Sequence, residues 1–155
     1  MANNYITIFE GTDLNVGARE VTEPDGITKR HQTAVVASGV LELPNTPQIE
    51  NVNTSGDYPA NPIDIRGYGN VIVKSVFTQS GQNCEIRFVL YLSDGTTVIG
   101  ESESLTISTT DRTEGTSYIG EMIVFDNSKV GASYLKINLV TPPSTGSVSF
   151  YIGGV

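Results

Sequence analysis

The sequence predicts an all-β fold: an antiparallel β-sandwich of the jelly-roll type with a loop-rich, extended N-terminal part. From Asn70 onward, apolar and polar residues alternate with a period of two. Turn residues separate these short runs, and no segment carries the spacing of an amphipathic helix. Short strands without helices between them are expected to pair antiparallel in two packed sheets, and a closed barrel is the runner-up.

Three segments show the alternation most clearly, namely residues 84–92, 135–139 and 147–152. In the first, the even-numbered residues from Ile86 to Leu92 form the expected core face. The odd-numbered residues from Glu85 to Tyr91 form a mixed outer face. In the other two segments the expected core residues are Leu135, Ile137, Leu139, Val148, Phe150 and Ile152.

Further strands are expected at residues 71–77, 103–108 and 118–125, with a short one at 97–99. Ser93-Asp94-Gly95 and the segment 142–146, which ends in Gly146, have the composition of hairpin turns. Glycine adopts positive φ without steric cost, and Asp bonds to its own backbone.

The first part of the chain has a different composition. Five of the 7 prolines and 9 of the 17 acidic residues lie in the first 69 residues, where alternation is weak. Strands are expected only at residues 5–9 and 32–43, and the proline-rich residues 44–62 are expected to be extended rather than helical. We therefore predict a single domain. Residues 1–62 form a loop-rich arm packed on that domain or on a partner, and residues 63–155 form the sandwich core.

The composition disfavours several classes of function. The chain has 155 residues and a net charge of −8, with a pI of about 4.5. Such a charge disfavours binding to nucleic acid, and no apolar run approaches the roughly 18 residues of a membrane span. The first residues lack the basic and apolar regions of a secretory signal, and Cys84 has no second cysteine to pair with. We expect synthesis in the cytoplasm.

The chemistry of known catalytic motifs is largely missing. The single histidine, His31, follows Lys29 and Arg30, so no carboxylate orients it in sequence. Cys84 opens an expected strand rather than a helix, which is unfavourable for a reactive thiolate. No nucleophile elbow or phosphate-binding loop occurs, and residues 67–69 are interpreted as a turn. We predict no catalytic, cofactor-binding or metal-binding residues, no cofactor, and no enzyme activity.

Two weaker possibilities stay open at this point. Residues 126–128, Glu101 with Glu103, and Asp111 with Glu114 offer oxygen atoms for calcium or carboxylates for a glycosidase, although solvated turns explain them more simply. Three tyrosines expected to point outward either form a contact surface, such as one for sugars, or pack on the sheet faces. They are Tyr91, Tyr134 and Tyr151.

Four segments carry a resemblance to a known class: the polar start Met1-Ala2-Asn3-Asn4, the stretch 62–73, and the ending segments 131–140 and 146–152. In these, the chain resembles the small all-β capsid decoration or cement proteins of tailed-phage virions. The resemblance implies a non-enzymatic protein of the virion that binds the major capsid protein. It also implies a homo-oligomer, with a trimer favoured. The alternative is a carbohydrate-binding or receptor-binding module of a phage tail or fibre.

Overall fold

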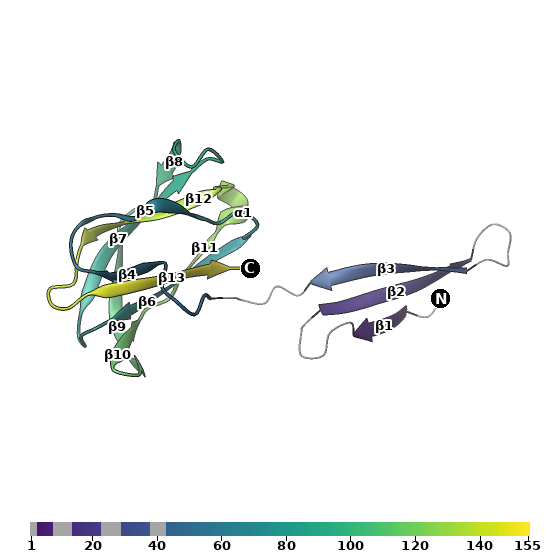
Figure 1. The fold of residues 1–155 in the computed structure, drawn as a ribbon, viewed down its shortest axis with the longest axis horizontal. Coiled ribbons are helices and arrows are strands. Elements are labelled where there is room, and N and C mark those ends of the chain that lie inside the picture. Colours follow the sequence, from purple (N-terminus) through teal and green to yellow (C-terminus); the bar gives the residue numbers. More distant parts are fainter. Residues whose placement is uncertain (1–2, 8–13, 23–28, 38–42) are drawn as a thin grey trace. The chain divides into compact units, whose positions relative to one another are not determined.

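The computed structural model describes residues 3–7, 14–22, 29–37 and 43–155, with side chains from residue 43 onward. The chain forms two compact units, Met1–Val40 and Leu41–Val155. Each unit is built from antiparallel strands, as Figure 1 shows.

The first unit contains a three-stranded sheet in the order β1-β2-β3. Its strands are β1 (Asn3–Thr7), β2 (Leu14–Thr22) and β3 (Lys29–Ala37). The sequence predicted strands near β1 and β3 but none at β2, so the loop expected there was wrong. Residues 14–22 show little alternation of apolar and polar residues, and it is backbone pairing on both edges that makes β2 a strand. Residues 38–42, part of the expected strand 32–43, lie outside the described residues.

The second unit is an antiparallel β-sandwich, which confirms the predicted fold class. Its strands are β4 (Ile49–Val52), β5 (Gly56–Asp64), β6 (Asn70–Phe77), β7 (Asn83–Tyr91), β8 (Val98–Glu101), β9 (Leu105–Glu114), β10 (Ser117–Gly120), β11 (Ile123–Asp126), β12 (Tyr134–Thr141) and β13 (Val148–Gly154). A one-turn helix, α1 (Asn127–Val130), follows β11.

The two layers of the sandwich are joined along one side by β9. One layer contains β4, β13, β6, β10 and β11, and the other contains β5, β12, β7 and β8. The first half of β9 pairs with β7, from Leu105 opposite Ile86 to Ser108 opposite Asn83. Its second half pairs with β10, with Thr109 opposite Gly120. Because β9 belongs to both layers, it closes this side of the sandwich over its own length.

The side chains between the layers form one apolar core. The expected core residues of β12 and β13 are all buried, as are Ile86 and Phe88 of β7. The outer face of β7 was predicted less well. Val89 is buried and Tyr91 is only 9% exposed. Tyr91 lies between β12 and β8, and Lys136 of β12 lies over its ring, with Nζ 6.0 Å from the ring centroid. On the expected core face, Leu90 is only partly buried, and Leu92 lies beyond the strand and is exposed, which corrects its assignment to the core.

Several predicted boundaries shift for identifiable reasons. The strand expected at 118–125 divides into β10 and β11, because the pairing of β10 with β9 changes register between Tyr118 and Gly120. The proline-rich residues 44–62 contribute β4 and most of β5, which are the two ends of the strand order.

The two expected hairpin turns have different outcomes. The turn at Asp94 joins β7 to β8 as a hairpin, and Gly95 there has a φ of 68°. The segment 142–146 connects β12 to β13, which lie in different layers, so it is a turn between sheets and not a hairpin. Residues 67–69 form the predicted turn, with Gly67 at a φ of 89°.

Gly120 allows β9, β10 and β6 to approach one another closely. A Cβ atom at this position would lie 2.7 Å from Cε2 of Phe77 and closer still to Oγ of Ser75. Both neighbours are fully buried, so neither has room to move away.

We therefore predict that Gly120→Ala destabilises the fold by about 1–3 kcal/mol, because overpacking a tight core forces strain. Thermal unfolding would measure the loss. The control is Gly100→Ala in β8, where nothing lies within 4 Å of the added methyl group. Equal melting temperatures for the two variants would contradict the prediction.

Candidate functional site

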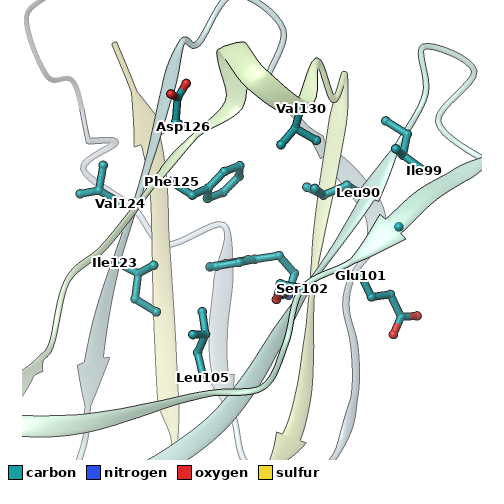
Figure 2. Close-up of a pocket in the computed structure, with 12 residues that line it drawn as sticks. Leu90, Ile99, Glu101, Ser102, Leu105, Ile123, Val124, Phe125, Asp126 and Val130 are labelled. Atoms are coloured by element: carbon teal, nitrogen blue, oxygen red, sulfur yellow. Dashed lines mark hydrogen bonds between the residues drawn. The ribbon is translucent and has the colours of Figure 1, made fainter.

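The feature of the second unit best suited to binding is an apolar groove between β8 and β11, with a volume of about 560 Å³. Figure 2 shows Ile123 and Phe125 of β11 facing Leu90 and Ile99 across it. This volume lies within the range of ligand pockets in proteins. The groove lies beyond the end of β9 that closes the sandwich, where the two layers have separate edges.

The floor and the ends of the groove come from elements that are far apart in sequence. Phe88 of β7 packs against Phe125, with ring centroids 5.1 Å apart, and Leu105 at the start of β9 closes one end. Val130, the last residue of α1, closes the other end. The lining is therefore aromatic and aliphatic almost throughout.

Helix α1 is held in place by a buried asparagine. Asn127 donates two hydrogen bonds, to the carbonyl oxygens of Tyr68 (3.2 Å) and Ala132 (3.0 Å), and its Oδ1 accepts one from the Ala132 amide (3.0 Å). Gly131 ends the helix with a φ of 69°. These bonds fix the position of Val130 at the groove.

Two polar residues of the groove lining, Ser102 and Asp126, form hydrogen bonds within the protein. Ser102 Oγ accepts from the amide of Phe88 and donates to the carbonyl of Glu103. Asp126 caps α1 by accepting from the Ser128 amide at 3.0 Å, and Lys129 lies 3.3 Å from it. The Ser128 hydroxyl is the main cause that lowers the pKa of Asp126. Asp126 is therefore a capping residue.

Two rows of backbone groups border the groove. In the described part of the chain, β11 pairs only with β6, and β8 pairs only with β7. Each strand thus has one edge on which alternate N–H and C=O groups have no partner strand. Exposed apolar side chains gather here, with Ile99 at 41%, Val130 at 45% and Val124 at 58% exposure.

The carboxylates considered for calcium from the sequence do not gather into a metal site among the described residues. Glu114 forms an ion pair with Lys74, and Glu101 lies at the rim of the groove with its carboxylate directed away (Figure 2). Among the residues described here, no three His, Cys, Asp or Glu side chains are grouped to hold a metal ion.

The three tyrosines do not share one open surface. Tyr91, expected to point outward, is buried, which corrects that prediction. Arg66 lies 5.1 Å from the ring centroid of Tyr134, and Lys74 lies at the same distance from that of Tyr151. Cations therefore cover one face of these two rings.

Cys84 and His31 are the other residues that the sequence offered as candidates for catalysis. Burial raises the pKa of Cys84 to about 12, so the thiol stays protonated and packs as an apolar residue. His31 belongs to β3, whose side chains lie outside the described part.

Comparison of the chain with protein-family models, with curated proteins and with solved structures finds no match. Among the described residues, no helix is long and apolar enough to span a membrane.

The groove could not be identified from the sequence, because its lining comes from four strands and one helix that are far apart along the chain. One signal was present in the sequence. Residues 122–125, Met-Ile-Val-Phe, interrupt the alternation with four consecutive apolar residues, so an apolar side chain must point to each side of the strand.

Two turns at the edge of the sandwich each contain an aspartate whose hydrogen bonds stabilise its charged form. At Asp94, bonds from the Thr97 side chain and from the amides of Thr97 and Thr96 lower the pKa to about 2. At Asp64, the side chain of Arg66 lowers the pKa to about 2 as well. These interactions are present above the ordinary pKa of 3.8 and are lost as the pH falls toward 2.

We predict that the melting temperature falls between about pH 4 and pH 2, and that Asp94→Asn makes this fall shallower. The reason is that the unfolded carboxylate takes up its proton at a higher pH than the folded one does. Differential scanning fluorimetry across this range measures the slope. Asp111→Asn, at an exposed position outside these turns, is the control, and an unchanged slope in Asp94→Asn would refute the assignment.

A second prediction concerns Asn127. Asn127→Ala leaves two carbonyls and one amide without their side-chain partner, which costs about 1–3 kcal/mol for each group that stays buried. Chemical denaturation should show a lower unfolding free energy than for Asn53→Ala, a change at an exposed position. If the two variants were equally stable, Asn127 would not be what anchors α1.

Proposed function

We propose that this protein is a non-enzymatic structural protein of a virion, a decoration or cement protein that binds and stabilises a phage shell. The all-β fold supports this role, as does the resemblance of residues 62–152 to such proteins. In this proposal the major capsid protein is the partner, and the protein acts as a homo-oligomer, with a trimer favoured.

The observation that carries the proposal is the exposed apolar groove between β8 and β11. Monomeric proteins rarely leave contiguous apolar surface open without a binding role. A protein surface that covers Ile99, Val124 and Val130 removes their apolar area from water. This burial stabilises the complex by roughly 25 cal/mol per Å² of apolar area.

The charge of the protein supports the choice of partner. A net charge of −8 keeps free copies apart and steers them toward basic patches on a shell. Because the Debye length falls to roughly 3 Å at 1 M salt, this steering is lost at high ionic strength. The burial of apolar side chains in the groove is not screened by salt.

We expect the purified chain to be an oligomer by light scattering and to co-sediment with its shell. Attachment should weaken between low salt and about 1 M salt. Val130→Lys places a charge at the groove and should reduce attachment about tenfold or more, a change of about 1.4 kcal/mol. The control is Leu92→Lys, an exposed apolar residue outside the groove lining.

A monomer with no affinity for shells would refute the proposal. Attachment that is equally strong for the two lysine variants would place the contact outside the groove.

A further inference from the structure

The groove requires a particular kind of occupant. Ser102 and Asp126 are engaged in hydrogen bonds within the protein, and the Glu101 carboxylate is directed away from the groove, so the interior offers mainly apolar contact. Hydrogen bonding is available from the backbone edges of β8 and β11 instead. An extended peptide satisfies both conditions, because its backbone adds to a strand edge while alternate side chains enter the groove.

Of the two edges, β11 is the better template. Its four residues pair with β6 in continuous register, from Ile123 opposite Val73 to Asp126 opposite Asn70. The pairing of β8 with β7 shifts register between Leu90 and Tyr91. Four extended residues span about 13 Å, which sets the length of the added strand.

The contrast with another edge of the sandwich supports this reading. The end strand β5 carries Pro59 and Pro62, which lack an N–H group, and charged residues at 57 and 64. These features are typical of edges that are protected against pairing. β11 has no proline, and its exposed central residue is Val124. Its one charged residue, Asp126, ends the strand and caps α1.

The charges around the groove indicate which side chains a bound segment should carry. Glu101 lies on the groove rim, and exposed Glu103 lies between the lining residues Ser102 and Leu105 in a chain of net charge −8. Asp126, also at the rim, is paired with Lys129. A second copy of the chain seated here would bring the same carboxylates against one another. A segment that alternates apolar residues with Lys or Arg meets both the apolar floor and the acidic rim.

We propose that the groove accepts an extended segment of a partner protein, with apolar residues alternating with Lys or Arg, as an added antiparallel or parallel strand on β11. The inference rests on the proposed function in one respect, since the shell protein is the expected source of this segment. Binding of the segment itself depends only on the groove.

The test measures binding of a fluorescent synthetic peptide of alternating valine and lysine to the full-length protein, by anisotropy. A second peptide has the same side chains and charge but carries an N-methyl group on every peptide amide, because methylation of alternate amides would leave one strand edge free to pair. It should bind at least about tenfold more weakly, because it cannot pair with a strand edge. A peptide of alternating valine and glutamate should bind more weakly still.

A pair of neighbouring substitutions locates the site. Ile99→Lys changes a residue that lines the groove, and Val98→Lys changes its exposed neighbour on β8, which does not line it. We expect the first to weaken peptide binding about tenfold and the second to leave it within about twofold. Circular dichroism confirms that both variants are folded.

Equal binding of the methylated peptide would overturn the inference, since it would indicate adsorption by charge alone. Equal loss in both lysine variants would also overturn it. If light scattering showed a dimer that only Ile99→Lys dissociates, a second copy would be the occupant and the inference would be wrong. Peptide binding without shell attachment would refute only the proposed function, and shell attachment without peptide binding would refute only this inference.

Discussion

The pairing of β9 with both layers is the constraint on which the rest of the sandwich depends. Over its first half β9 completes the layer of β7, and over its second half it completes the layer of β10. A strand can change layers in this way only where its neighbours approach closely, and Gly120 permits that approach because it lacks a side chain. The core residues Phe77 and Ile107 pack at this crossing.

The same crossing explains the groove. Where β9 pairs, the two layers share a strand and no edge is free. Beyond its first residue, Leu105, the open side of β7 is occupied by the short strand β8, and the open side of β6 is occupied by β11. These two strands do not pair with each other, so the layers end in separate edges with the apolar floor between them. Helix α1, anchored by Asn127, closes the far end.

The groove combines two properties that a stable monomer usually avoids. It exposes apolar side chains, and it borders strand edges with unpaired backbone groups. Either property favours contact with another chain, and their combination favours an extended one. The acidic residues nearby then determine which partner binds, because they repel a second copy of this acidic protein and attract a basic segment.

Sequence alone determined the fold class and most strands of residues 70–155, because alternation is a local property that survives in any antiparallel pairing. Ile86, Leu135 and Phe150 were assigned to the core for this reason, and they are buried. Tertiary structure decided what depends on neighbours across the sheet. The burial of Tyr91 depends on its neighbours in β8 and β12, strand β2 requires pairing on two edges, and the groove requires β8 and β11 to face each other. None of these relations is local in sequence, so no periodicity within one segment encodes them.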